Sequence, residues 1–91
     1  MNIYLSAKNS NNPIEYSNKI HRASDVDVKV ALYVALRAQD MDVVKKLIKY
    51  ANLRAVAEVQ LNYENVAVTI GFAVNRDMAK LLKDKVDSAF D

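Results

Sequence analysis

The stretch from Ser24 to Asn52 constrains the fold of this chain more than any other segment. It is the longest segment in which apolar residues recur at helical spacing, and neither proline nor glycine interrupts it. Ser24 with Asp27 three residues later forms a capping-box pattern, in which side chains satisfy free amides of a first helical turn. The pattern predicts a long helical region against which the rest of the chain must pack.

Apolar residues within this region follow spacings of three and four, as on the buried face of a helix. The predicted stripe consists of Val30, Val34, Ala38, Met41, Val44, Ile48 and Ala51. One unbroken helix would satisfy this pattern. Asp40 and Asp42 allow a second interpretation, because aspartate is a weak helix former and a good N-cap. On that interpretation one helix ends near Gln39 and another begins at Met41.

Within ALYVALRAQDMDVVKKLIKYAN, one set of residues has the spacing of a known helical hairpin. The set consists of Leu32, Ala35, Val43, Val44, Lys45 and Leu47. In these positions the segment resembles an ankyrin repeat, although Gln39 and Ala51 stand where that repeat has glycines. The match occurs once and covers about a quarter of the chain, whereas a solenoid needs at least about three stacked repeats. The resemblance implies a helical hairpin and no more.

The N-terminal segment predicts a strand followed by a break. Residues 1–8 alternate between two sets of side chains, one of them apolar, which is the period of a half-buried strand. Residues 9–13, with the sequence NSNNP, would end this strand. Residues 13–23 allow two interpretations: a short helix capped by Asn12, or an ordered loop with a few apolar anchors.

The C-terminal half predicts a β-hairpin and a final helix. Between Leu53 and Val74 the apolar residues alternate with a period of two, and the polar residues 62–65 suggest a turn between two strands. Asn75 can cap a last helix, with Phe90 as the anchor at its end.

Together these elements predict a single α+β domain over residues 1–91. A three-stranded, mainly antiparallel sheet would carry the helices on one face, in the order strand, helical region, strand, strand, helix. The expected core residues of the sheet are Ile3, Leu5, Val59, Leu61, Val68, Ile70 and Phe72. The expected core residues of the helices are Val30, Val34, Met41, Val44, Ile48, Leu82 and Val86.

Composition and motifs argue against several classes of function. The chain has 13 basic and 11 acidic residues, a balance that predicts neither a polyanion nor a membrane partner. Without cysteine there is no thiolate site, and the single glycine gives no phosphate-binding loop. His21 has no visible nucleophile beside it, and the acidic pairs Asp25/Asp27 and Asp40/Asp42 fall at predicted helix starts, where they act as caps. We therefore expect no enzymatic activity, cofactor or metal.

The same sequence predicts a soluble, cytoplasmic protein. The N-terminus lacks the basic start and the apolar run of a signal peptide. No segment approaches the roughly 20 apolar residues that span a bilayer.

A face of mostly small side chains on the predicted hairpin is the leading candidate site. Its residues, with their cross-strand neighbours, are Val56, Glu58, Ala67, Thr69, Gly71 and Ala73. Solvent-facing strands usually carry longer polar side chains, whereas small side chains let another surface approach closely. Either another part of this chain, such as residues 9–23, covers the face, or another molecule does. In the second case the chain is a non-enzymatic protein-interaction module that binds a partner protein or forms a homodimer, as small phage and mobile-element inhibitors of host factors do.

Nucleic-acid binding is the alternative function. Lys45, Lys46, Lys49 and Arg54 lie close together in the sequence. Phosphate contacts need such basic clusters, and the resulting affinity falls steeply with salt. A solvated helix face is the simpler explanation, because core residues interrupt the cluster and no aromatic residues are interleaved for stacking on bases.

Overall fold

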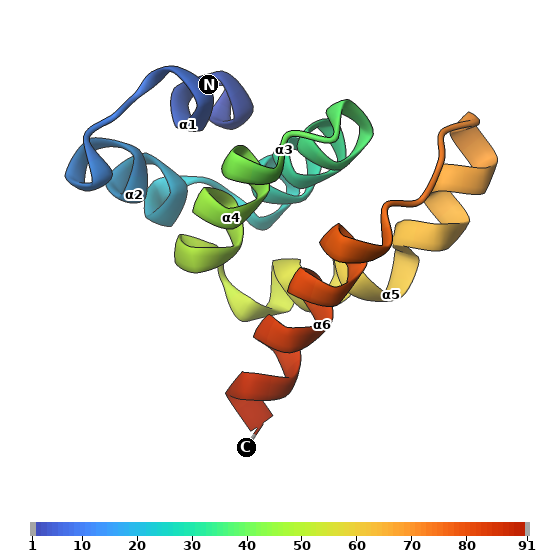
Figure 1. Ribbon diagram of the computed structural model, residues 1–91. Coiled ribbons are helices and arrows are strands. Elements are labelled where there is room, and N and C mark those ends of the chain that lie inside the picture. Colours follow the sequence, from blue (N-terminus) through green and yellow to red (C-terminus); the bar gives the residue numbers. More distant parts are fainter. Residues whose placement is uncertain (1, 91) are drawn as a thin grey trace.

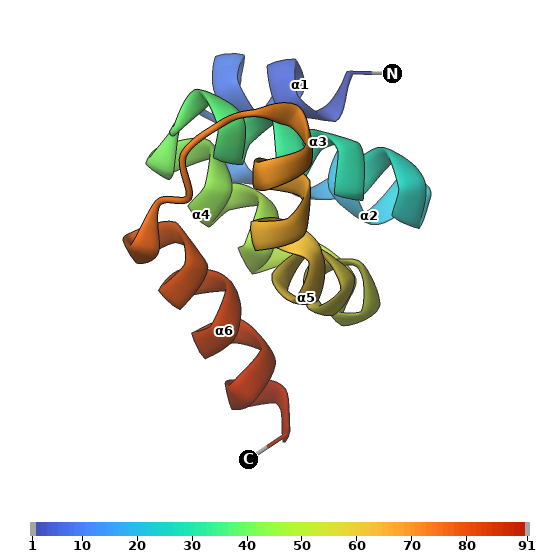
Figure 2. The same ribbon diagram turned by 90° about the vertical axis from the view of Figure 1, so that its right-hand side faces the viewer.

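The computed structural model describes residues 2–90, which form six α-helices (Figures 1 and 2). They are α1 (Ile3–Asn9), α2 (Pro13–Arg22), α3 (Asp25–Ala38), α4 (Met41–Tyr50), α5 (Leu53–Ile70) and α6 (Arg76–Phe90). Residues 2–90 contain no strand, so the predicted α+β fold with its three-stranded sheet is wrong. Met1, Asp91 and the side chain of Phe90, the predicted anchor of the last helix, lie outside the description.

Helix α3 is central to the packing. Helices α1, α4 and α5 pack against it, α5 and α4 also pack against α6, and α2 packs against α1 and α4. All six helices contribute to one apolar core. Both views show the C-terminal turns of α6 projecting away from the other helices (Figures 1 and 2). No helix among the described residues is both long and apolar enough to cross a lipid bilayer.

The central region is a helical hairpin and not one continuous helix. Helix α3 ends at Ala38, Gln39 adopts a left-handed backbone with φ of 55°, and α4 begins after Asp40. The carboxylate of Asp40 accepts a hydrogen bond from the amide of Val43 at 3.3 Å. The interpretation with a turn at Asp40 is confirmed, because aspartate stabilises a helix start better than a helix interior.

Side-chain caps begin several other helices as the sequence predicts. Ser24 caps α3 by accepting a hydrogen bond from the amide of Asp27 at 3.2 Å. Asn12 caps α2, so the helical interpretation of residues 13–23 is confirmed. Asn75 accepts hydrogen bonds from two amides in the first turn of α6, at 2.9 and 3.3 Å.

The segment predicted as a β-hairpin is helix α5, with 18 residues. Its buried residues are Ala55, Val56, Val59, Tyr63 and Ala67, which follow helical spacing. Tyr63 falls in the stretch that was predicted to be a polar turn, but its ring is buried and its hydroxyl accepts a hydrogen bond from the amide of Asn75 at 2.9 Å. The apolar alternation misled because it coexists with a helical stripe, and packing decides between the two.

The predicted N-terminal strand is also a helix. The side chain of Asn2 accepts a hydrogen bond from the amide of Leu5 at 3.0 Å and caps α1. Ile3 and Ala7 are buried, while Leu5 between them is exposed. Two buried residues four apart fit both a period of two and a helical turn, so a pattern this short cannot separate the structures.

Part of the predicted core is therefore displaced. The expected core residues that are buried are Ile3, Val44, Ile48, Val59 and Leu82. Those that are partly buried are Met41, Phe72 and Val86. Those that are exposed are Leu5, Val30, Val34, Leu61, Val68 and Ile70. In α1 and α5 the error follows from assigning strands, and in α3 it follows from choosing the wrong side of a helix that is apolar on two sides.

Candidate functional site

An exposed apolar row on α3 is a prominent feature of the surface. Val26, Val30 and Val34 follow at intervals of four residues, with 63%, 56% and 42% of their surface exposed. Residues four apart lie one above the other on a helix, so these side chains form a continuous ridge, here called the α3 ridge. Exposure of adjacent apolar side chains to water is unfavourable, which makes the ridge a candidate binding surface.

The ridge is exposed because α3 packs through its opposite side. The buried residues of α3 are Val28, Ala31, Leu32, Ala35 and Leu36. At 3.6 residues per turn they centre about half a turn away from Val30. A helix that is apolar on both sides is normally covered on both sides, and here only one is covered.

A groove lies between the α3 ridge and α1. Tyr4 lines it from α1, and Asp27, Val30 and Val34 line it from α3, around a cavity of about 380 Å³. The Nζ of Lys8 lies 5.7 Å from the centroid of the Tyr4 ring, a distance at which the cation and the ring attract each other. An aromatic ring and one carboxylate thus adjoin the ridge.

The two ends of α3 carry opposite charges. Asp25 and Asp27 lie in its first turn, and Arg37 lies in its last turn. Arg37 follows Val30 by seven residues, nearly two full turns, and so lies on the same side of the helix as the ridge. The ridge therefore has an acidic group at one end and a basic group at the other.

Lys29, the other basic residue of α3, is paired with α5. Its Nζ lies 2.6 Å from the carboxylate of Glu58. The hydrogen bond to Glu58 raises the pKa of Lys29, and the same bond lowers the pKa of Glu58. Burial raises the pKa of the Tyr33 hydroxyl on the same helix. This pair ties α3 to α5 and leaves Arg37 as the basic group at the end of the ridge.

The predicted hairpin face does not form one surface, because α5 replaces the hairpin. Val56 and Ala67 are fully buried in the core. Glu58 is exposed but paired with Lys29. Thr69 is exposed, and its hydroxyl donates a hydrogen bond to a carbonyl one turn earlier in α5, at 2.7 Å.

The two remaining residues of that face lie at or beyond the end of α5. Gly71 is the C-cap of α5, with a left-handed φ of 78° that glycine adopts at little cost. Its amide donates a hydrogen bond to the carbonyl of Ala67 at 2.9 Å. Ala73 is exposed in the connection to α6. Gly71 therefore ends a helix and does not lie within a strand, so its predicted placement in a strand is wrong.

Helix α5 exposes apolar residues of its own. Leu61 and Val68 are 73% and 81% exposed and lie seven residues apart, on one side of the helix. Leu61 also lines a groove of about 460 Å³ between α5 and α6, together with Lys80. Glu64 and Asn65 lie exposed between the two apolar residues. Polar groups thus interrupt this surface, whereas the α3 ridge is continuous.

The four basic residues predicted to bind nucleic acid do not form one free cluster. Lys45, Lys49 and Arg54 are exposed. Lys46 is partly buried, and its Nζ donates hydrogen bonds to two carbonyls at the end of α1, at 2.9 and 3.1 Å. Nucleic-acid binding stays a prediction, which a mobility shift at low salt would test.

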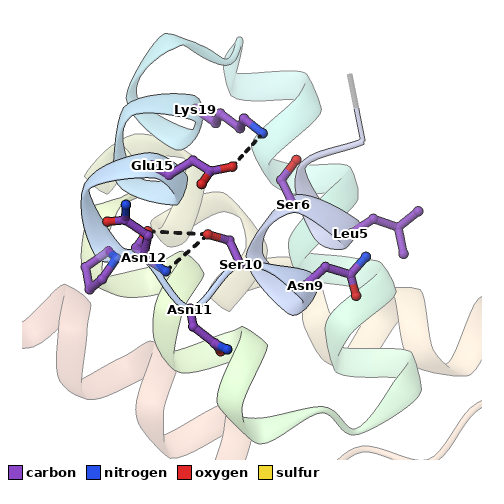
Figure 3. A pocket seen from close by; sticks show the side chains of 9 residues that line it. Leu5, Ser6, Asn9, Ser10, Asn11, Asn12, Glu15 and Lys19 are labelled. Atoms are coloured by element: carbon purple, nitrogen blue, oxygen red, sulfur yellow. Dashed lines mark hydrogen bonds and ion pairs between the residues drawn. The ribbon is translucent and has the colours of Figure 1, made fainter.

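A cavity of about 840 Å³ lies between α1 and α2 (Figure 3). Ser10, Asn12, Glu15 and Lys19 are among the polar residues that line it. Ser10 and Asn12 exchange hydrogen bonds at 3.2 and 3.4 Å, and Lys19 lies 3.5 Å from Glu15. Because these polar groups pair with one another and none is buried, the cavity indicates no particular ligand.

Catalytic and metal-binding groups do not converge in the part of the chain that the structure describes. His21 is exposed, with its ring centroid 6.0 Å from that of Tyr50. Residues 2–90 contain no group of three or more His, Cys, Asp or Glu that could hold a metal ion. The two predicted acidic pairs lie at the starts of α3 and α4, as expected for caps.

No family model matches the sequence, and no curated protein or solved structure matches it. Function is therefore inferred from the surface of this chain alone. The α3 ridge is the site that sequence reasoning missed. Its signal was present, because Val26, Val28 and Val30 place valines on both sides of a helix and thereby predict two apolar faces.

Proposed function

We propose that this chain is a non-enzymatic protein-interaction module whose binding surface is the α3 ridge. The observation that carries the proposal is the continuous row of exposed valines on a helix that already buries its opposite side. Removing such apolar side chains from water is favourable, so their burial against another protein would stabilise a complex.

The neighbourhood of the ridge also suits a protein partner. The Tyr4 ring adds apolar area beside the valines, and Asp27 and Arg37 supply charged groups at the rim. Protein interfaces commonly combine an apolar centre with a polar rim of this sort. The cytoplasmic location, and a role like that of small phage or mobile-element inhibitors of host factors, stay predictions.

Site-specific photo-crosslinking tests the proposal. A benzophenone amino acid at Val30 should give a discrete adduct in an extract of cells that produce the chain, and mass spectrometry should identify the protein attached. The same reagent at Asn18, which is exposed on α2, is the matched control and should give no such adduct. A second change in the ridge, Val34→Glu, should abolish the adduct at Val30. Adducts that are the same at both positions would overturn the proposal.

A further inference from the structure

The arrangement of the α3 ridge is self-complementary. Val26 precedes Val30 by four residues and Val34 follows it by four, so the outer valines lie about 6 Å to either side along the helix axis. A twofold axis through Val30 would place Val26 of one copy opposite Val34 of a second. The surface thus fits its own image with the helix direction reversed, as an isologous interface requires.

The charges on α3 favour the same orientation. In an antiparallel pair, Arg37 of each copy comes to lie near the first turn of the other copy's α3. Asp27 is then about four residues, or 6 Å, further along, within the reach of an arginine side chain. A parallel pair would instead oppose carboxylate to carboxylate and arginine to arginine. Antiparallel helix dipoles add to the preference, because the partly negative C-terminal end of one α3 then lies beside the partly positive N-terminal end of the other.

The surface available suits a weak dimer. A standard interface buries roughly 800 Å² per partner, which is about a seventh of the 5681 Å² surface of this chain. Tyr4, Asp27, Val30 and Val34 line one groove and can therefore contribute to such an interface together. We expect a concentration-dependent dimer, half-formed at chain concentrations on the order of 10–100 μM.

We propose that the α3 ridge binds a second copy of this chain, with α3 packed antiparallel on α3 and Arg37 of each copy paired with Asp27 of the other. This inference rests on the proposed function and names the partner.

Charge reversal tests the pairing by sedimentation equilibrium. Asp27→Arg and Arg37→Glu should each weaken the dimer at least tenfold, because each places like charges together at both ends of the interface. An equimolar mixture of the two variants should dimerise again, since the mixed pair opposes arginines to acids at both ends. The double variant should also dimerise, because it restores opposite charges at both ends of the antiparallel pair. A parallel pair would oppose like charges in the native chain and in both single variants alike, so neither single reversal would weaken it.

Matched controls carry the same charge reversals at exposed positions on other helices. Asp42→Arg lies in the first turn of α4, and Arg22→Glu lies in the last turn of α2. Both should leave the dimer unchanged. Circular dichroism should show that every variant folds, since the reversed groups are exposed or form no contact in the core.

Several outcomes would overturn the inference. The native chain staying monomeric near 1 mM would do so, as would a dimer that survives both single reversals or a double variant that stays monomeric. Cross-linking separates this failure from that of the proposed function. If the chain is monomeric but Val30 still gives an adduct with an identified different protein, the second copy is ruled out as the partner and the interaction surface stands. If Val30 gives no adduct at all, both proposals fail.

Discussion

Helices α3 and α4 adjoin in the sequence and pack together, yet they distribute their apolar residues differently. Helix α4 has one apolar side, with the buried residues Val43, Val44, Leu47 and Ile48. Its exposed residues are Asp42, Lys45 and Lys49. Helix α3 buries five residues and also exposes the three valines of the α3 ridge.

This difference shows how a sequence can define a helix without defining its inner side. The polar residues of α4 leave only one side of the helix that can face the core. In α3 both sides are apolar, so only the packing of α1, α4 and α5 determines which side is buried. The side that is not selected remains available for binding.

The largest expected effect comes from the buried side of α4. Leu47→Ala should lower the free energy of unfolding by about 2–5 kcal/mol, because Leu47 is fully buried and its truncation leaves a cavity. The matched change on the exposed ridge, Val34→Ala, should alter it by less than about 0.5 kcal/mol. Urea unfolding of the two variants measures both free energies, at chain concentrations below those at which the dimer is expected to form. Equal losses would show that the ridge is part of the core.

The next effect concerns a lysine of α4 that acts as a structural group. Lys46 donates to the carbonyls of Ala7 and Ser10, and its Nζ lies 5.0 Å from the ring centroid of Tyr16. Lys46→Met should therefore cost about 1–3 kcal/mol of unfolding free energy, since hydrogen bonds to a charged group are lost.

Lys45→Met is the control for Lys46, because Lys45 is the exposed neighbour on the same helix. It should change the unfolding free energy by less than about 0.5 kcal/mol. A loss at Lys46 no greater than that at Lys45 would contradict the role of Lys46 in closing the end of α1.

A smaller effect of opposite sign is expected at the junction of α3 and α4. Gln39 has a left-handed φ of 55°, which side chains with a Cβ adopt at a cost. Gln39→Gly should raise the free energy of unfolding by about 0.5–1 kcal/mol, because glycine removes this cost at a helix C-cap. Thermal unfolding should show the gain as a higher Tm.

Gly71→Ala is the converse change, at the C-cap of α5. Gly71 has a φ of 78°, and an added Cβ would meet no atom within 4 Å, so any loss reports backbone strain alone. The alanine variant should lower the Tm. If alanine at Gly71 raised the Tm, or if neither substitution changed it, left-handed strain would not govern these two helix ends.

The starts of α3, α4 and α6 could be predicted because local chemistry sets them. Ser24, Asp40 and Asn75 each cap a helix through their own side chains, and such contacts depend on few residues. The turn at Gln39 followed from the same reasoning, although the sequence also allowed one long helix. Local signals of this kind are independent of how distant elements pack.

The strand predictions were wrong where the apolar residues fit a period of two and a helical period at the same time. The run from Val66 to Val74, which begins in α5 and ends beyond it, alternates as a strand does, yet Tyr63 and Ala67 continue the buried stripe of a helix. The candidate face on the hairpin failed with the hairpin, because helical geometry sends Val56 and Ala67 into the core. The α3 ridge needed tertiary packing to be found, since nothing local tells which side of α3 is covered.

The smallest effect concerns the one ion pair that joins α3 to α5. Lys29 and Glu58 lie 2.6 Å apart but remain accessible to solvent, unlike the carbonyl contacts of Lys46. Since the pKa of Glu58 is lowered by folding, its stabilising effect is present above the unfolded carboxyl pKa and is lost as the pH falls through the lower, folded value. The pKa of Lys29 is raised, so its effect is present below the unfolded lysine pKa and is lost as the pH rises through the higher, folded value. The pair should therefore stabilise the fold between about pH 5 and pH 10.

The Tm of Glu58→Gln should lie slightly below that of the native chain at pH 7, and the two should converge near pH 3 as the native carboxylate is protonated. A gap that stays constant from pH 7 to pH 3 would show that Glu58 acts through packing and not through its charge.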